Sequence, residues 1–463
     1  MSPDVLIVGA GPAGMSAAIS LAYSGARVRV VDEQLAPGGQ VYRALDRVST
    51  AYPDALQILG KEYADGAVLS DAFKTASVEF SASTSVWDIT GGKRPTVGLV
   101  KDERAEMLHP THIILAGGAM ERPTPFPGWT LPGVMGVGAA QTLLKESGLV
   151  PKGKVIIAGT GPLVYLYARQ MIAAGAPPTV IVDSAPARVP AALWGLLLKA
   201  GLADFGPLNK GRSWLKHIRA AGVDHLNGVT EWKAIGDQSV KGIEYRRRVG
   251  TRRLECDLLL VHDGVIPNTH LSMVAECSHR WHPLQRYWAP TVNAAGASSQ
   301  PGISIAGDGA GIEGADAAAC RGRIVGFSVA CHLGLIGREE LKSKIADDQR
   351  KLNKLAILRS FLDHFYRPLP SMQVPPAADT IVCRCEEVTA GEILKVAKSG
   401  CVGPNQGKAF TRCGMGPCMG RYCGTTVSQI IADHHGLSVE DVGHYRIRPP
   451  VRPLRVGQLA ALD

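Results

Sequence analysis

Apolar runs and glycine turns follow one another in a fixed order at the start of the chain. The run "DVLIVGA" predicts a buried strand and leads into "GAGPAG". The segment Pro12 to Ser24 then predicts a helix, with proline in its first turn and Gly25 closing it. A second apolar strand, "RVRVVDE", comes next. The order of strand, glycine turn, helix and strand predicts a nucleotide-binding unit.

The same order returns at Lys154. There "KVIIAGTGPLV" precedes a helix expected through Ala174, and "TVIVD" ends at Asp183. Three further apolar strands end in glycine: "HIILAGG", "DLLLVHDG" and "GISIAGDG". The carboxyl ends of parallel strands form the ligand crevice in open α/β sheets. The pattern therefore predicts an α/β fold with two Rossmann-like units.

The first glycine turn has the residues that a dinucleotide needs. Gly9 allows the tight turn, Gly11 lets the backbone approach a pyrophosphate, and Gly14 lets the helix pack on the strand. Asp32 ends the second strand, at the spacing where an acid accepts hydrogen bonds from a ribose. This context predicts a dinucleotide site rather than an empty glycine turn.

Two later features favour FAD over NAD at this site. "EQLAPGGQVYR" has a glycine pair whose backbone could run beside a flavin. Asp308 in "GISIAGDGAGIEG" stands where an aspartate holds ribityl hydroxyls in flavoproteins, although a helix-capping role stays open.

The body resembles the two-dinucleotide-binding-domain flavoproteins, which include thioredoxin reductase and ferredoxin reductases. The resemblance covers residues 1 to 345 and implies that the backbone of Leu115–Gly118 lies near the flavin, although the usual threonine is Gly117 here. The body has no CxxC motif, which excludes a dithiol reductase. The candidate FAD-binding residues are Gly9, Gly11, Pro12, Ala13, Gly14, Asp32, Glu33, Gly39, Gln40, Arg43, Ala116, Gly117, Gly307 and Asp308.

The second glycine turn departs from the motif. "GTGPLV" keeps Gly159 and Gly161, but Val164 stands at the third glycine position. A β-branched side chain there is expected to push helix and strand apart or to shift the helix start. Asp183 could still accept a ribose. Gly159, Gly161 and Asp183 are therefore candidates for NAD(P) or another nucleotide, and a fold kept after its ligand was lost is narrowly favoured.

Composition narrows the class of protein. A chain of 463 residues with 46% apolar content can build two or three packed domains. The net charge is +9, but the basic residues are scattered without interleaved aromatics, so no nucleic-acid partner is expected. The N-terminal apolar run is too short for a signal peptide, and no run is long enough for a transmembrane segment. These features predict a cytoplasmic protein. No catalytic acid or base is assigned.

Cysteines gather near the end of the chain. Six of the ten follow residue 380, and clustered thiols in a reducing compartment indicate a metal site. "CRCEEV" supplies a CxC pair, and "TRCGMGPCMGRYC" supplies three more candidates where four ligands suffice. Glycines 414, 416 and 420 are expected to let backbone N–H groups reach cluster sulfides. A structural zinc site with four cysteine ligands is the alternative.

This module resembles the bacterioferritin-associated-ferredoxin-type [2Fe–2S] domain, which also ends the large subunit of anaerobic glycerol-3-phosphate dehydrogenase. The shared string is "GMGxCxGxxC". The resemblance selects Cys383, Cys385, Cys418 and Cys423 as ligands and makes Cys413 a bystander. A set with Cys413 in place of Cys423 has the same four-residue gap and stays open.

The whole chain resembles the large (α or A) subunit of heteromeric flavin-dependent opine oxidases, D-hydroxyproline dehydrogenases and hydrogen cyanide synthase. The resemblance rests on "GAGPAG", "DEQLAPGGQVYR", "PGWTLPGVMGVGAAQ", "AGDGAGIEGADAA", "CRCEEV" and "TRCGMGPCMGRYCG". It implies an electron-transfer subunit that binds FAD and [2Fe–2S]. It also implies a second, FAD-containing catalytic subunit that oxidises a C–N bond, and a quinone or carrier as acceptor. FMN at an interface between subunits and a third, small subunit stay open.

The resemblances imply five parts of the chain. These are an FAD-binding domain (1–150 and 266–345), an NAD-like domain (151–265), a helix and proline-rich linker (346–379), the iron–sulfur domain (380–440) and an extended tail (441–463). Two other functions stay open: a self-contained NAD(P)H-dependent reductase of an electron carrier, and a non-catalytic scaffold with a zinc site.

Overall fold

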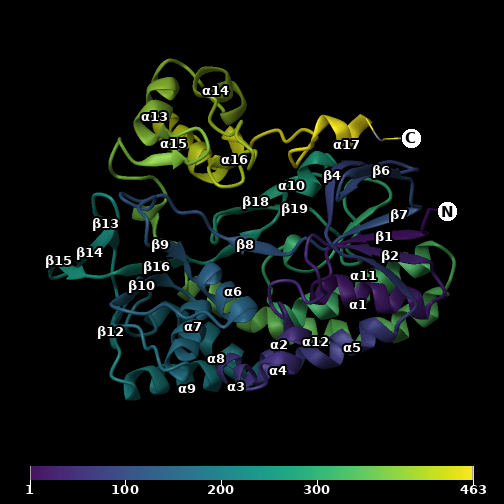
Figure 1. Ribbon diagram of the computed structural model, residues 1–463, viewed down its shortest axis with the longest axis horizontal. Coiled ribbons are helices and arrows are strands. Elements are labelled where there is room, and N and C mark those ends of the chain that lie inside the picture. The colour runs from purple at the N-terminus through teal and green to yellow at the C-terminus, as the bar shows by residue number, and fades with distance from the viewer. Residues whose placement is uncertain (1, 461, 463) are drawn as a thin grey trace.

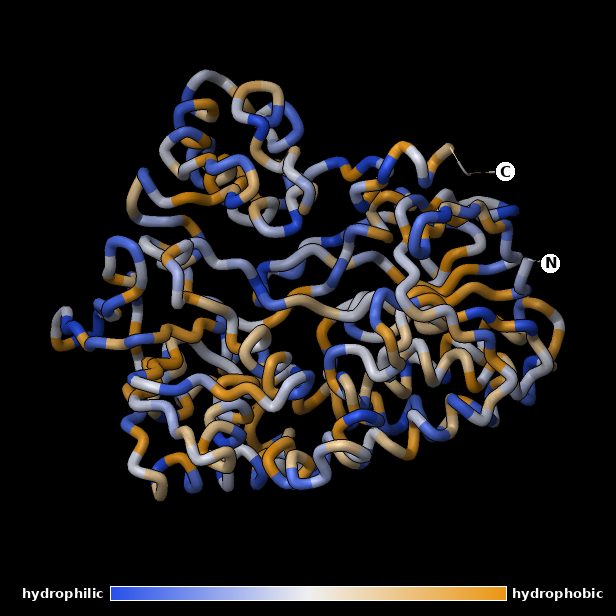
Figure 2. The backbone as a smooth tube through the Cα atoms, in the orientation of Figure 1, coloured by the Kyte–Doolittle hydropathy of each residue, from blue (hydrophilic) through white to orange (hydrophobic). Residues whose placement is uncertain are grey.

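The first glycine turn follows the central strand of a parallel sheet. The computed structural model describes residues 2–460 and 462. The strand order is β20 (Ile303–Ile305), β7 (His112–Leu115), β1 (Val5–Val8), β2 (Val28–Val31) and β3 (Val78–Ser81). All residues of β1 and β7 are buried, which explains their continuous apolar runs. Figure 2 shows these strands as orange segments inside the molecule.

Two helices pack closely beside this sheet. α1 (Pro12–Tyr23) follows the glycine turn, and α11 (Ala315–His332) lies against it (Figure 1). A Cβ atom on Gly322 would lie 2.2 Å from the Ala13 carbonyl oxygen, and one on Gly326 would lie 2.7 Å from that of Ala17. Glycine at both positions therefore allows the close approach of the two helices.

A second parallel sheet repeats the plan. Its order is β12 (Asp224–Leu226), β11 (Val180–Asp183), β10 (Val155–Thr160), β16 (Leu258–Asp263) and β9 (Val134–Gly136). Its helices include α6 (Val137–Ser147), α7 (Pro162–Ala173) and α9 (Gly206–Ala220). The predicted two-unit α/β fold is confirmed. β9 falls within the 1–150 segment expected for the first domain but pairs with β16 in the second sheet.

Antiparallel elements and further helices complete the body. The sheets are β4 (Thr84–Thr90), β5 (Thr96–Lys101) and β6 (Arg104–Leu108), and β13 (Glu231–Gly236), β14 (Val240–Arg247) and β15 (Gly250–Glu255). The ribbons are β8 (Ala119–Glu121) with β17 (Val265–Pro267), and β18 (His279–His282) with β19 (Tyr287–Pro290). The other helices are α2 (Leu45–Ala51), α3 (Ala55–Leu59), α4 (Lys61–Ala64), α5 (Gly66–Thr75), α8 (Trp194–Ala203), α10 (His270–Val274) and α12 (Arg338–Phe365).

Over the described residues, no helix on its own has both the length and the apolar character to cross a bilayer. One pair, Ala191–Ala203 with Gly206–Ala220, reaches those criteria only when its two members are joined, and they are bent by 110°.

A cysteine module, residues 380–440, lies above the body as the yellow-green part of Figure 1. It contains β21 (Ile381–Cys383), β22 (Val388–Thr389), α13 (Ala390–Lys398), α14 (Pro404–Thr411), α15 (Gly424–His435) and the start of α16 (Val439–Val442). The C-terminal tail, described here from residue 441 to 460, then crosses back over the body. The tail has no regular structure from Gly443 to Arg455 and forms the short helix α17 (Val456–Ala460).

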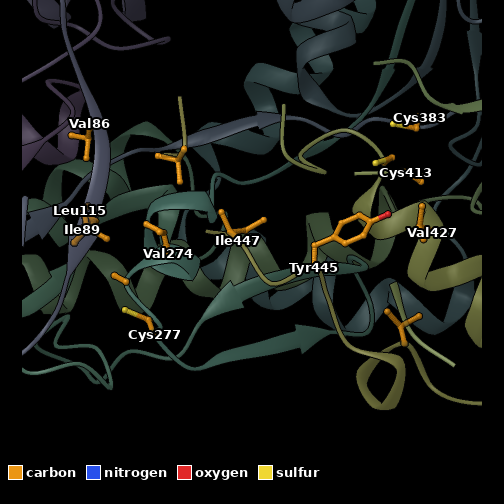
Figure 3. Close-up of a cluster of buried hydrophobic side chains, with 14 of the residues drawn as sticks. Val86, Ile89, Leu115, Val274, Cys277, Cys383, Cys413, Val427, Tyr445 and Ile447 are labelled. Carbon is orange, nitrogen blue, oxygen red and sulfur yellow. The ribbon is translucent and has the colours of Figure 1, made fainter. Parts of the chain in front are cut away.

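The module and the body share one apolar core. Figure 3 shows Val86, Leu115 and Val274 of the body in the same cluster as Ile447 and Val427. A continuous core of this kind holds the module against the body through packing rather than through the linker alone.

Candidate functional site

A large cavity of about 890 Å³ opens at the carboxyl ends of β1, β2 and β7. Its position agrees with the crevice expected for an open α/β sheet. Twelve of the fourteen candidate FAD-binding residues line it: Gly9, Gly11, Pro12, Ala13, Asp32, Glu33, Gly39, Gln40, Arg43, Ala116, Gly117 and Asp308.

The remaining two candidates, Gly14 and Gly307, have packing roles. A Cβ atom on Gly14 would lie 1.8 Å from the Gly9 carbonyl oxygen. Gly307 has φ +69°, and a Cβ atom there would lie 2.7 Å from the Cβ of Ala13. Both glycines therefore shape the turn without lining the cavity.

The cradle for a pyrophosphate is built from two crossing backbone segments. A Cβ atom on Gly39 would lie 2.8 Å from the Cα of Gly11, so a side chain would collide with the opposite segment. Gly9 has φ +104°, and a Cβ atom there would lie 2.4 Å from the Ala116 carbonyl oxygen. The N-terminus of α1 adds free N–H groups and positive dipole beside this bare backbone. These residues fit a dinucleotide.

Asp32 orders the loops that border the cavity. Its carboxylate accepts hydrogen bonds from the backbone N–H groups of Ala10 at 2.6 Å and Gln34 at 2.8 Å. Burial raises the pKa of Asp32, and these two N–H groups oppose the shift. Its neighbour Glu33 forms an ion pair with Arg452 of the tail.

Asp308 lines the cavity and also binds backbone before α11. Its Oδ1 accepts hydrogen bonds from the N–H groups of Glu313 at 2.9 Å and Gly314 at 3.0 Å. Gly314 is the N-cap residue of α11. Burial raises the pKa of Asp308, and the same two N–H groups oppose this.

The acid that follows the second glycine turn, Asp183, is enclosed by protein. Asp183 is fully buried, and its carboxylate is bonded to the Tyr165 hydroxyl at 2.5 Å, to His225 Nε2 at 2.8 Å and to the Ala185 N–H at 2.8 Å. A Cβ atom on Gly159 would lie 1.7 Å from the His262 carbonyl oxygen.

None of the three candidates in this turn, Gly159, Gly161 and Asp183, is among the residues that line the large cavity. The expectation that Val164 might shift the helix start was wrong. α7 begins at Pro162, three residues after the first glycine of its turn, just as α1 does at Pro12. Val164 is fully buried and packs into the core of the second unit instead.

A half-buried acid–base pair lies between the two units. His262 Nδ1 and Glu121 Oε1 are 2.8 Å apart, and the Gly138 N–H donates to the same carboxylate oxygen at 2.8 Å. Both side chains line the cavity. The sequence assigned no role to His262, although its place near the carboxyl end of the strand "LLLVHD" was a signal that it could face the crevice.

The cysteine module brings three thiols together. The sulfur atoms of Cys383, Cys413 and Cys423, here called the cysteine triad, all lie within 4.8 Å of one another, and all three residues are buried. Hydrogen bonds from the other two thiols lower the pKa of Cys383 to about 2. The bond with Cys383 raises the pKa of Cys413 to about 12 and also raises that of Cys423. A thiolate facing two thiols is suited to a soft metal or an iron–sulfur centre.

The other two cysteines lie beside the triad. Cys385 is exposed and lies next to Cys418. Partial burial raises the pKa of the Cys385 thiol; the Cys418 backbone N–H opposes this shift, and the Cys418 thiol adds to it. The ligand set expected from the resemblance is therefore divided, with Cys383 and Cys423 in the triad and Cys385 and Cys418 next to each other. Cys413, expected as a bystander, is part of the triad.

The glycines of the module make room for neighbouring side chains. A Cβ atom on Gly416 would lie 2.2 Å from the Cβ of Cys385. Gly414 and Gly420 face the ring of Tyr445. The Gly414 N–H does point at the Cys383 sulfur, as expected for backbone donors near a centre. Close packing, which a single sequence does not reveal, accounts for the rest.

The dinucleotide cavity reaches the cysteine module. Arg384 lies between Cys383 and Cys385, and Arg421 and Tyr422 lie between Cys418 and Cys423; all three line the cavity. These residues were not assigned from the sequence, although their position between candidate ligands was a signal.

Trp129 of the body contacts the cysteine module directly. Its indole N–H donates to the Ile381 carbonyl oxygen at 2.7 Å, and the Arg384 guanidinium lies 6.0 Å from the centre of its ring. Trp129 also lines the cavity. The residues next to the cysteines thus form part of the wall of the dinucleotide site.

Two family models match the chain. Residues 3–193 match the pyridine nucleotide-disulphide oxidoreductase family, and residues 378–463 match the sarcosine oxidase A3 domain. The crystal structure of L-proline dehydrogenase from P. horikoshii superposes with a TM-score of 0.69, at 17% identity, over 99% of this chain and 79% of that one. T. acidophilum thioredoxin reductase superposes with a TM-score of 0.52, at 19% identity, over 72% and 98%. At these identities the two structures show the fold alone.

Curated relatives match along the whole length. The opine oxidase A subunit of Agrobacterium tumefaciens (strain Ach5) is 40% identical over 99% of this chain and 92% of its own. The hydrogen cyanide synthase HcnB subunit of Pseudomonas aeruginosa is 34% identical over 97% of this chain and 96% of its own. Together with the fold and the cavity, this similarity shows that the chain belongs to the family of opine oxidase A subunits and hydrogen cyanide synthase HcnB subunits, flavin-type oxidoreductases of heteromeric enzymes.

Proposed function

We propose that this chain is the electron-transfer subunit of a heteromeric dehydrogenase that oxidises a C–N bond of an opine, amino acid or secondary amine. The observation that carries the proposal is the shared wall between the two sites. Arg384 and Arg421, each flanked by candidate metal ligands, line the same cavity as Gly11 and Asp308. Two redox centres in such an arrangement would be close enough for electrons to pass between them.

FAD is the proposed occupant of the cavity. The bare backbone at Gly11 and Gly39 would hold the pyrophosphate, and Asp32 and Asp308 would border the ribose and the ribityl chain. Bound FAD would take two electrons together and an iron–sulfur centre one at a time, so the pair would suit the division of a hydride. The residues of the cavity would position the FAD and exclude water from it.

A [2Fe–2S] centre is the proposed occupant of the cysteine module, held by Cys383, Cys385, Cys418 and Cys423. The sarcosine oxidase A3 match and the buried triad support a metal centre here. A four-cysteine zinc site uses the same ligand type. Iron and acid-labile sulfide analysis separates the two, because zinc would leave no sulfide and no visible absorption.

The partner is proposed from the relatives. The opine oxidase and hydrogen cyanide synthase relatives are named as subunits, which supports a partner chain. The family resemblance adds that this partner is a second, FAD-containing catalytic subunit. The electrons would leave toward a quinone or a carrier protein in the cytoplasmic compartment. FMN at the interface and a third, small subunit fit the same scheme.

The competing reductase requires the second glycine turn to bind NAD(P)H. The engagement of Asp183 by Tyr165 and His225 weighs against this, because a ribose would have to displace both. We therefore infer that the second unit serves as structure.

Co-expression tests the function. The chain is purified with and without the protein encoded beside it, and opines and amino acids are screened with an artificial acceptor. Amine oxidation by the complex and by neither protein alone is expected. Reduction of the flavin of the isolated chain by NADH would instead support the reductase, and amine oxidation by the isolated chain would contradict the division of labour.

A further inference from the structure

Tyr445 occupies the floor of the cysteine module. Its side chain is 3% exposed, although it comes from the tail rather than from the module itself. A Cβ atom on Gly414 would lie 2.5 Å from the Tyr445 Cζ, and one on Gly420 would lie 2.4 Å from its Cδ2. Two of the three glycines in the cysteine string thus make room for this ring. A ring held so tightly has one position available to its hydroxyl.

The hydroxyl of Tyr445 points toward the cysteine triad (Figure 3). It is buried and makes no well-aligned hydrogen bond among the described residues, although it lies beside the Cys413 sulfur. The groups around it are the sulfurs of Cys413, Cys423 and Cys383. A buried, unpaired O–H group is costly to leave without an acceptor, and the sulfur atoms are the acceptors within its surroundings.

A tyrosine hydroxyl is an O–H donor at neutral pH. The Lys408 ammonium lies 4.7 Å from the centre of the ring and donates to the Arg446 carbonyl oxygen at 3.2 Å. Attraction between this cation and the ring face helps to hold the ring in place.

We propose that Tyr445 is a positioning residue for the metal centre, and that its hydroxyl donates a hydrogen bond to the centre on the side of Cys413 and Cys423. This inference rests on the iron–sulfur centre of the proposed function. Reduction adds negative charge to such a centre, so a fixed donor stabilises the reduced form and raises the reduction potential. Gly414 and Gly420 then affect the reduction potential of the centre indirectly, because they leave room for the Tyr445 ring.

The test compares Tyr445→Phe with the unaltered full chain by redox titration followed with electron paramagnetic resonance. Phenylalanine keeps the ring against Gly414 and Gly420 and removes only the O–H. Iron and sulfide content should stay the same, while the potential should fall. The equilibrium constant for reduction of the centre should fall about tenfold, which lowers the potential of a one-electron centre by about 59 mV. The potential of the flavin in the same chain should not move.

Tyr167→Phe is the matched control. Tyr167 is likewise buried, and its hydroxyl has no hydrogen-bond partner among the described residues, but it lies in the core of the second unit. The same substitution there should leave the potential of the metal centre unchanged. Equal shifts in both variants would overturn the proposal, because the change would then reflect general loosening.

A measurement on the unaltered chain covers the case in which Tyr445→Phe loses iron. Resonance Raman bands of the Fe–S bonds should shift when exchangeable hydrogen is replaced by deuterium, and the absence of any shift would overturn the proposal. An unchanged potential in iron-loaded Tyr445→Phe would overturn the role of Tyr445 alone. Zinc in the unaltered chain would overturn the iron–sulfur assignment and the tuning role with it.

Discussion

Single side chains distinguish the two similar glycine turns of this molecule. Asp32 and Asp183 both end the second strand of their unit, yet only Asp32 lines the cavity. Asp183 is covered by Tyr165 from its own helix α7 and by His225 from β12. The spacing from glycine to acid is therefore present in both units, while the access of a nucleotide differs.

Asp183→Ala should destabilise the protein rather than affect a ligand. The substitution leaves the Tyr165 hydroxyl and the Ala185 N–H buried without their acceptor, and we expect a loss of about 2–4 kcal/mol in the free energy of unfolding. Chemical denaturation measures it. Asp224→Ala, an exposed acid on the neighbouring strand β12, should change stability by less than about 0.5 kcal/mol. Equal effects would contradict the proposed structural role of Asp183.

Cys423→Ser and Cys413→Ser should differ in iron content. The proposed ligand set includes Cys423 and omits Cys413, although both belong to the triad. We expect Cys423→Ser to lose most of the iron and sulfide and Cys413→Ser to retain them, as measured by metal analysis after anaerobic purification. The reverse result would assign Cys413 as the ligand in place of Cys423.

At the residue level, local spacing predicted the cavity well and the cysteine site in part. Gly9, Gly11 and Asp32 were found because their roles depend on backbone turns that neighbouring residues specify. Arg421 and Tyr445 were missed, because their roles arise from contacts across domains that one sequence does not display.

At the level of elements, the C-terminal tail joins the module to the flavin-type domain. The Val451 N–H donates to the Trp87 carbonyl oxygen at 2.8 Å, and Arg455 pairs with Glu103 at 2.6 Å. Val451 and Arg452 both line the dinucleotide cavity. Pro449, Pro450 and Pro453 are incompatible with a helix in this part of the tail. Which surface the segment covers depends on packing that the sequence does not show.

Truncation after Arg448 should weaken flavin binding and spare the metal centre. The shortened chain keeps Tyr445 and Ile447 in the shared core but loses the wall formed by Val451 and Arg452. We expect a several-fold lower ratio of flavin to protein after desalting, with iron content unchanged. Arg452→Gln, which removes only the ion pair with Glu33, should show a smaller loss. Full retention of flavin by the truncated chain would show that Val451 and Arg452 do not contribute to flavin binding.

Acid should loosen the docking of the module. Burial lowers the pKa of both His270 and His279 to about 4, from 6.5. His270 bonds to the Met419 carbonyl oxygen at 3.2 Å, and the His279 ring lies 5.5 Å from that of His444. Well above pH 6.5 the two histidines are neutral in the folded and in the unfolded protein, so they cost no stability. As the pH falls toward 4 the unfolded form takes up protons first, so stability is lost by up to about 3 kcal/mol per histidine.

Thermal unfolding between pH 7.5 and 4.5 measures this effect. Replacing His270 and His279 by glutamine should flatten the dependence of Tm on pH. His109→Gln, at an exposed position, should leave the slope as it is. A slope that survives the double substitution would assign the acid sensitivity to other groups.

At the level of the whole molecule, the proposed flavin site and the proposed metal centre are neighbours. The cysteine module lies on the open side of the dinucleotide cavity, and residues from both line one space. His262 of the second nucleotide-type unit and Glu121 of β8 also line this space, whereas Gly159, Gly161 and Asp183 are not among its lining residues. The fold class followed from sequence because glycine turns and apolar runs are local. The approach of the module to the cavity did not, because it depends on a core assembled from both ends of the chain.

An anaerobic reductive titration of the purified full-length chain tests this proposed pair of centres. A flavin accepts two electrons and a two-iron centre accepts one, so the chain should take up about three, with a paramagnetic iron signal appearing as the flavin absorbance bleaches. Uptake of about two electrons with no iron signal would show that the chain carries a flavin without a second centre, and the role of electron conduit would then be refuted.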